Sequence, residues 1–363
     1  MSDRRRARSP WRANRAVATP PEPPTAAPPP SGAAPKEPGF WKRTAKSLTL
    51  PVLISTVGGT FAVVTAAAGV YQLVNKPRER CDVLRNSLRD PRTELSVITP
   101  VLRDSVLGCA TGQRATAFLD AVTAKLRDKA PYVSDSSCTS PRMGKPNVQT
   151  AADANIQRAI DLAVVLAHKT GQSIDLRRTD LHDAEFNRAT LRRANFTGAC
   201  LAGARFHGTS AEGASFLGAR LDAASFNGAQ LNGAVFDSVV GVWTELTEST
   251  LTDASFEGAR LVRARFNESD LACTRFTGEA VLDTTDFSST NLRWSYLRGA
   301  SLVGARNWRD IDSTGLTGTL LFEQRGLTTA LLDVARKGGA YVDTQPDEWI
   351  TRRDSACARR DRE

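Results

Sequence analysis

The sequence has a period of five residues, which neither a regular helix nor a flat strand produces. In the stretch GASFLGARLDAASFNGAQLNGAVF, residues 213–236, a large apolar residue returns at every fifth position, and an alanine lies two residues before each one. An α-helix repeats about every 3.6 residues and a strand about every two. The chain must therefore turn by a constant amount every five residues, with one small and one large side chain directed inward each time.

This register extends far beyond the opening stretch. It runs from Leu176 to Phe276 without an insertion, slips by one residue within TGEAVL (277–282), and resumes at Leu282. Its weakest part is SVVGVWTE (238–245), where we expect a bulge or a small loop, with Trp243 covering the gap that Gly241 leaves in the core. The predicted core residues are Phe186, Leu191, Phe196, Leu201, Phe206, Phe216, Leu221, Phe226, Leu231, Phe236, Leu246, Leu251, Phe256, Leu261, Phe266, Leu271, Phe276, Leu282, Phe287 and Leu292.

The repeat units ANFTG, ARFHG, ASFLG, ASFNG, AQLNG and ASFEG resemble the pentapeptide repeat family, whose consensus is close to A-(D/N)-L-x-x. The resemblance implies an all-β solenoid over residues 173–306, a right-handed quadrilateral β-helix with four pentapeptides in each coil. Phenylalanines would then stack in two lines on opposite faces, one containing Phe186, Phe206, Phe226 and Phe266, the other Phe196, Phe216, Phe236, Phe256 and Phe276.

The segments on either side of the repeats look like caps, because a solenoid must cover its exposed ends. Residues 76–172 predict a helical lead-in region, whose last helix directly precedes the repeats and serves as the N-terminal cap. Residues 307–340 predict a C-terminal capping segment, with a helix over about 321–337 that Gly338 and Gly339 end. We expect residues 341–363 to be a polar tail.

The N-terminal part of the sequence predicts a tail and a membrane anchor. Residues 1–46 are rich in proline and carry ten Lys and Arg against three acids, a charge of +7, so we expect a disordered basic tail. Residues 47–75 contain no charge and are long enough for one transmembrane helix. Positive charges lie on both sides of this helix, so the side of the cell membrane on which the repeats lie stays open.

Two features of this N-terminal region bear on resemblance and assembly. Small residues four apart, as in Ser55/Gly59, allow helix pairing and a homodimer, although chance produces the same spacing in an alanine-rich segment. The order of the segments resembles membrane-associated pentapeptide repeat proteins of actinobacteria, on the short stretches NVQTAA and LTTALLD.

The six cysteines show no CxxC pair, which argues against a zinc ribbon or a thioredoxin-type site. Cys81, Cys109 and Cys138 lie outside the repeats and can form a disulfide if that region is outside the cytoplasm. Cys200 and Cys273 lie within the repeats, and we interpret both as ordinary surface or rim residues.

The sequence contains no recognisable catalytic pattern. Its three histidines, His168, His182 and His207, are scattered, and no phosphate-binding loop, nucleophile elbow or HExxH sequence is present. Asp283 and Asp286 in DTTD could hold a cation, but a solvated corner is the simpler interpretation. We therefore expect no enzymatic activity, no catalytic residue, no cofactor and no metal.

These observations favour a membrane-anchored, non-enzymatic scaffold that presents a rigid rod to a protein partner of unknown identity, with Trp243 as the predicted contact and no nucleic-acid binding. The alternative is a DNA-mimicking modulator of a type II topoisomerase, because some pentapeptide repeat proteins resemble duplex DNA in shape and charge. Residues 173–310 carry 15 Lys and Arg against 17 acids, mixed along the repeats, whereas DNA mimicry needs a strongly acidic surface.

Overall fold

The computed structural model describes residues 77–90, 92–97, 106–130, 138, 151–307, 311 and 315–360. The predicted basic tail (1–46) and membrane helix (47–75) lie outside these residues. Within the described part of the chain, no helix combines the length and the apolar character needed to cross a membrane.

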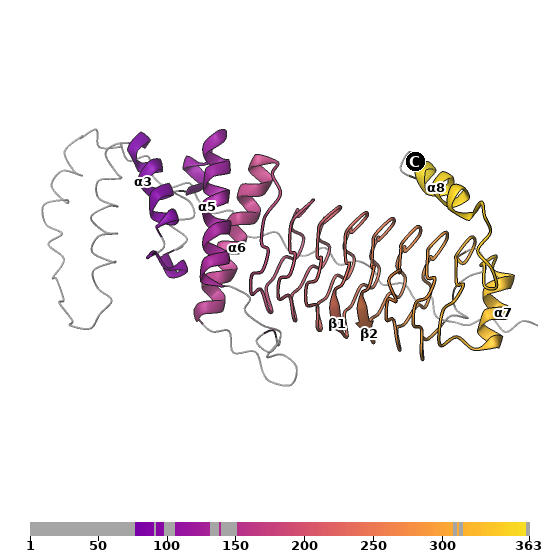
Figure 1. Ribbon diagram of the computed structural model, residues 1–363. Helices are drawn as coiled ribbons and strands as arrows, with labels where there is room; N and C mark the ends of the chain where they lie inside the picture. The colour runs from indigo at the N-terminus through magenta and orange to yellow at the C-terminus, as the bar shows by residue number, and fades with distance from the viewer. Residues whose placement is uncertain are drawn as a thin grey trace, which may run out of the picture. The chain divides into compact units, whose positions relative to one another are not determined.

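The repeats form a solenoid in which each coil pairs with the next through parallel backbone bridges (Figure 1). Residues 20 positions apart are partners, as in Asp175↔Asn195 and Ser215↔Val235, so each coil contains four pentapeptides. The only regular strands among the described residues are β1 (Val240–Val242) and β2 (Arg260–Val262), which pair in parallel. The coils thus follow the predicted five-residue register.

The one-residue slip predicted within TGEAVL is confirmed. Bridge partners are 20 residues apart up to Ser255↔Arg275, and the next pair, Arg260↔Val281, is 21 apart. The spacing returns to 20 at Val281↔Ser301, because by then both partners lie beyond the extra residue. The solenoid accommodates this residue at a corner and keeps its ladder of backbone hydrogen bonds.

The core of the solenoid is a continuous column of apolar side chains. Every predicted core residue from Phe186 to Leu292 is exposed by 1% or less. The two predicted phenylalanine lines are confirmed, with ring centroids 4.8 Å apart for Phe186 and Phe206 and 4.7 Å apart for Phe216 and Phe236. Rings of the two lines also meet edge to face, as Phe216 and Phe226 do at 5.4 Å.

The expected bulge at SVVGVWTE is not present, and Trp243 does not fill the core there. Val240–Val242 is instead the regular strand β1. A Cβ atom on Gly241 would lie too close to Thr244 Oγ1, so this backbone leaves no room for a larger side chain at position 241. Thr244 is fully buried and donates to Leu221 O at 3.0 Å. Trp243 points outward and is 44% exposed.

Helices precede the solenoid, as predicted. They are α3 (Pro77–Arg89), α5 (Gln113–Lys129) and α6 (Ala151–Thr170), with a short 3-10 turn, η1 (Leu95–Val97). The Gln157 side chain of α6 donates to Glu185 O at 2.8 Å and accepts from Glu185 N at 2.9 Å. Leu166 of α6 and Leu176 of the first coil belong to one hydrophobic cluster, so these helices cap the solenoid core.

An ion pair joins α5 to the first coil. Arg127 Nη1 lies 3.0 Å from Asp175 Oδ2, and Arg177 also binds this carboxylate, at 2.9 Å. Burial raises the pKa of Asp175, but hydrogen bonds from Arg177 and the charges of both arginines lower it by more. The carboxylate is therefore charged at neutral pH and ties the N-terminal cap to the repeats.

The C-terminal cap differs from the prediction, which ended the repeats at 306 and placed a helix at about 321–337. The solenoid continues, with bridges Tyr296↔Leu320 and Leu320↔Tyr341. The helix α7 is shorter, Thr329–Lys337, and ends at Gly338 as expected. Residues 296 and 320 are 24 apart rather than 20, and this longer coil hides the repeat pattern in the sequence.

The expected polar tail at 341–363 contains a further helix, α8 (Trp349–Arg360). Trp349 is 1% exposed, and its Nε1 donates to Gly318 O at 2.8 Å. The Arg353 side chain donates to the Cys273 carbonyl of a repeat coil. These contacts with distant residues anchor a helix whose own composition is mostly polar.

Candidate interaction surface and covalent links

All six cysteines form disulfides, which corrects the interpretation of Cys200 and Cys273 as ordinary rim residues. The pairs are Cys81–Cys109, Cys138–Cys200 and Cys273–Cys357. Two of them join a repeat coil to a segment outside the regular coils, 62 and 84 residues away in sequence. The even number of cysteines was the only sequence signal, because pairing depends on which residues the fold brings together.

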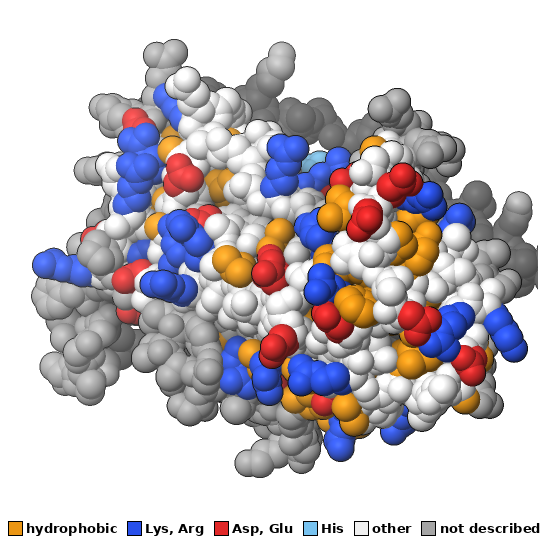
Figure 2. Space-filling model, turned by 45° about the vertical axis from the view of Figure 1, so that its right-hand side comes forward, with side chains coloured by type: hydrophobic (Ala, Val, Ile, Leu, Met, Phe, Trp, Pro, Cys, Tyr) orange, Lys and Arg blue, Asp and Glu red, His pale blue; other side chains and the backbone are white. Residues whose placement is uncertain are grey.

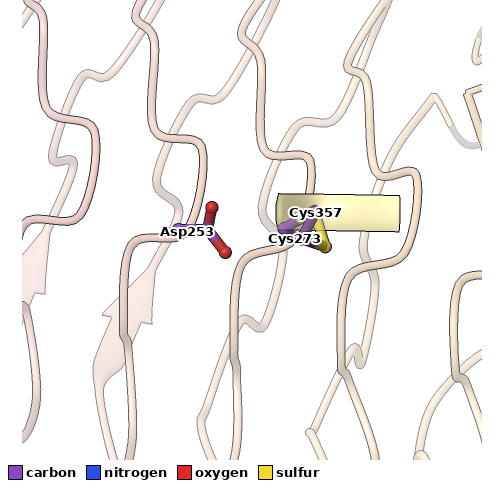
Figure 3. A group of neighbouring side chains, drawn as sticks. All are labelled: Asp253, Cys273 and Cys357. Carbon is purple, nitrogen blue, oxygen red and sulfur yellow. A yellow bond between two sulfur atoms is a disulfide. The ribbon is translucent and has the colours of Figure 1, made fainter. Parts of the chain in front are cut away.

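One group of side chains has the residue types of a metal site. Figure 3 shows Asp253 beside Cys273 and Cys357, and the potential ligand atoms of the three lie within 4.8 Å of one another. The two sulfur atoms are bonded to each other, so neither is available as the thiolate that binds metal. The Asp253 carboxylate instead lies 3.8 Å from the Arg353 guanidinium of α8. The group is a covalent anchor for α8.

The DTTD pair is engaged in hydrogen bonds that hold neighbouring coils together. Asp283 Oδ1 accepts from Ser301 Oγ at 2.6 Å and from Val303 N at 3.1 Å. Asp286 accepts from Ser288 and Asn307. Burial raises the pKa of Asp286, but these hydrogen bonds lower it by more. The two carboxylates accept hydrogen bonds from different residues. They therefore have a structural role, as the simpler interpretation of DTTD expects.

Two histidines of the solenoid each contact a polar side chain through a ring nitrogen. His182 Nδ1 lies 2.8 Å from Asp180 Oδ1, and His207 Nε2 lies 2.8 Å from Ser225 Oγ. His168 belongs to the last turn of α6. Among the residues that the structure describes, the three histidines are therefore separate rather than grouped around one reaction centre.

Some charges along the solenoid are matched between successive coils, and others form no ion pair among the described residues. Arg205 binds Glu185 at 2.8 Å, and Arg265 binds Glu245 at 3.0 Å, each pair 20 residues apart. Figure 2 shows Lys and Arg side chains interspersed with Asp and Glu over one face of the molecule. Such a mixed surface lacks the continuous negative field of a DNA mimic.

An apolar patch interrupts this pattern around β1 and β2, and we call it the Trp243 surface. Val242 lies beside Val262 and Val240 beside Arg260 in the strand register. The Arg263 guanidinium lies 4.9 Å from the centroid of the Trp243 ring, in a cation–π contact. The Trp243 surface consists of Val240, Val242, Trp243, Arg260, Val262 and Arg263.

The side chains of this surface are available to a partner. Val240 is 36% exposed and Trp243 is 44% exposed, while Val242 and Val262 are half-buried. Trp243 has a φ of +64°, in the left-handed region that is unusual for a bulky residue. The structure thus places an aromatic side chain on a fixed backbone corner, pointing away from the core.

Comparison with known proteins identifies the class of this chain. The family described as pentapeptide repeats matches eight copies, over residues 172–198, 199–237 and 244–278. With the five-residue register, the stacked coils and the buried phenylalanine lines in place, the chain belongs to the pentapeptide repeat family. The matched segments lie within the solenoid.

Several solved structures are similar to parts of the chain. One is a trypsin-treated form of QnrB1, a plasmid-mediated fluoroquinolone resistance protein, at 19% identity over 50% of this chain and 93% of that one, with a TM-score of 0.31. Another is a pentapeptide repeat protein of the Arabidopsis thaliana thylakoid lumen, at 32% identity over 31% and 68%, with a TM-score of 0.18. A third comes from the cyanobacterium Cyanothece 51142, at 17% identity over 35% and 89%, with a TM-score of 0.24. No curated protein matches.

Proposed function

We propose that this protein is a membrane-anchored, non-enzymatic scaffold that presents its solenoid to a protein partner. The observation that carries the proposal is the Trp243 surface, an exposed aromatic–arginine pair beside valines. Tryptophan and arginine dominate the binding energy of many protein interfaces. Because backbone hydrogen bonds fix every coil to the next, such a surface is ready for binding without rearrangement.

A scaffold role also accounts for how the polar side chains are used. Several of the histidines and carboxylates of the described coils bond to polar groups of the same or the neighbouring coil, and no grouping among them combines a nucleophile, a base and an oxyanion donor. The side chains that remain exposed are surface groups held in a fixed register. That arrangement suits recognition of a partner better than catalysis.

The disulfides support a location outside the cytoplasm. Three pairs use all six cysteines, and such bonds form and persist mainly in oxidising compartments. In this orientation the N-terminal tail, with its charge of +7, lies inside the cell, as the excess of basic residues in cytoplasmic segments favours. The anchor would be residues 47–75, and the repeats would face the envelope.

The alternative, modulation of a type II topoisomerase by DNA mimicry, has less support. Topoisomerases act on DNA in the cytoplasm, whereas the cysteine pairing favours the other side of the membrane. The ion pairs Arg205–Glu185 and Arg265–Glu245 also neutralise the acidic side chains that mimicry requires.

The location can be tested in intact cells with a membrane-impermeant thiol reagent. We expect no labelling of Cys109 or Cys138 before treatment with an impermeant reductant, and labelling after it. Labelling that requires cell lysis would refute the location outside the cytoplasm. A cytoplasmic protein with one engineered surface cysteine serves as the control for membrane integrity.

The binding role can be tested with a photo-crosslinking amino acid placed in the full chain. Residues 242, 247, 252 and 257 are suitable, because each follows a core residue directly and the four sample the four faces of one coil. Irradiation of the cells that naturally produce the protein should give a discrete crosslinked product from at least one position. Crosslinks from none of the four would refute the scaffold role.

A further inference from the structure

We infer that the partner of the Trp243 surface is a protein that presents a carboxylate beside apolar side chains. This inference rests on the proposed function and specifies the chemistry of the partner at that site. It follows from two properties of the surface: its apolar side chains, and two arginines that form no ion pair among the described residues.

The apolar part of the surface is not required by the core. Thr244 closes the core beside Gly241, and Trp243 lies outside the buried column with 44% of its surface exposed. Its left-handed backbone is one that glycine adopts with less strain, and glycine stands at the equivalent corner, Gly203, two coils earlier. The same left-handed corner recurs in other coils, at Ala223 and Arg263, so what distinguishes position 243 is the exposed aromatic side chain and not its backbone.

The charged part of the surface is unbalanced toward positive. Neither Arg260 nor Arg263 forms an ion pair with any residue in the described ranges, although both are exposed. The nearby carboxylates are engaged, since Asp222 binds Arg220 at 2.7 Å and Asp283 accepts from Ser301. Two guanidinium groups thus stand next to the valines with no carboxylate among the described residues in ion-pair contact with them.

The adjacent face of the same coils offers a direct contrast. There Arg265 has its acid, Glu245, one coil away at 3.0 Å. On the Trp243 surface the position one coil before Arg263 holds the tryptophan instead of an acid. The cation–π contact orients the guanidinium and leaves its N–H groups able to donate to a carboxylate, which is the strongest and most directional partner for arginine.

The flanking acids indicate a protein partner rather than a polyanion. Asp222 and Asp283 lie at either end of the Val242–Val262 pair, in the coils before and after. A nucleic acid or an anionic lipid surface would meet these carboxylates as well as the arginines. A single acidic side chain between apolar ones would contact Arg260 or Arg263 and pack its neighbours on the valines and Trp243.

The test uses the four crosslinking positions and adds charge reversals. We expect the strongest crosslink from residue 242, which lies on the Trp243 surface, and loss of about tenfold or more of that product in Arg260→Glu or Arg263→Glu. The matched control is Arg265→Glu, which reverses a charge on the adjacent face of the same coil and should leave the product unchanged. Circular dichroism of each purified full-length variant would establish that it folds.

The identity of the crosslinked segment completes the test. The partner peptide attached at residue 242 should contain Asp or Glu beside apolar residues, and replacing that acid by arginine should restore crosslinking to the Arg263→Glu variant. Crosslinks confined to residue 247, 252 or 257, or an unchanged yield in both reversals, would overturn the inference and leave the scaffold role intact. A product that consists of nucleic acid or lipid would overturn it as well.

Discussion

The number of ring contacts around each phenylalanine should set the cost of removing its ring. Phe216 has four ring partners, stacked on Phe196 and Phe236 and edge to face with Phe206 and Phe226. Phe186, at the N-terminal end of the same core, has two ring partners. Both side chains are exposed by 1% or less, so a change to leucine removes a ring that is equally buried at the two positions.

An aromatic pair contributes at least about 0.5 kcal/mol beyond the area that it buries. Phe216→Leu should therefore lower the free energy of unfolding by about 2 kcal/mol, and Phe186→Leu by about 1 kcal/mol. Leucine already stands in a phenylalanine line at Leu246, so both variants should fold. Denaturant unfolding of the oxidised protein gives both values. Equal losses at the two sites would show that buried area alone, and not ring contact, stabilises the column.

Three further perturbations probe the core, the C-terminal anchor and the N-terminal cap. Gly241→Ala should destabilise the fold by about 1–3 kcal/mol through overpacking against Thr244, and Thr244→Ala in the same chain should recover part of that loss in thermal unfolding. Changing both Cys273 and Cys357 to serine should cost about 2–4 kcal/mol and speed proteolysis within α8, whereas unchanged proteolysis would mean that the non-covalent contacts suffice. Because the folded state lowers the pKa of Asp175, its contribution to stability is present above its unfolded pKa of about 3.9 and is lost as pH falls through the folded value. Unfolding midpoints measured between about pH 2 and 6 should therefore depend less on pH in Asp175→Asn than in the natural protein.

Much of the solenoid can be predicted from sequence because its contacts are nearly local. Core residues pack on residues ten or 20 positions away, so the pattern of Phe226, Leu231 and Phe236 repeats in the chain as it does in space. The slip within TGEAVL is visible for the same reason. The prediction fails at SVVGVWTE, where Val240–Val242 is a strand instead of the expected bulge and Thr244 closes the core beside Gly241.

The covalent links and the C-terminal cap could not be predicted, because they depend on residues that the fold brings together. Cys273 and Cys357 are 84 residues apart, and nothing in either local sequence indicates the other. α8 is polar and is held by Trp349 and Arg353, whose partners Gly318 and Cys273 belong to distant coils. The sequence predicted Trp243 as the residue that contacts a protein partner, and this role in binding stays a prediction.

The sequence by itself determined the five-residue register and the residues of the core, and its resemblance to the pentapeptide repeat family implied the coil that buries them. Only the tertiary structure decided which exposed side chains lie together and form the surface proposed to bind a partner. Arg263 belongs to the Trp243 surface because it lies 4.9 Å from the Trp243 ring one coil earlier. Arg260 belongs to it because its bridge partners, Val240 and Val281, are valines and not acids. Such pairings arise across coils, where residues 20 apart become neighbours, and a local pattern does not reveal which charges remain unmatched.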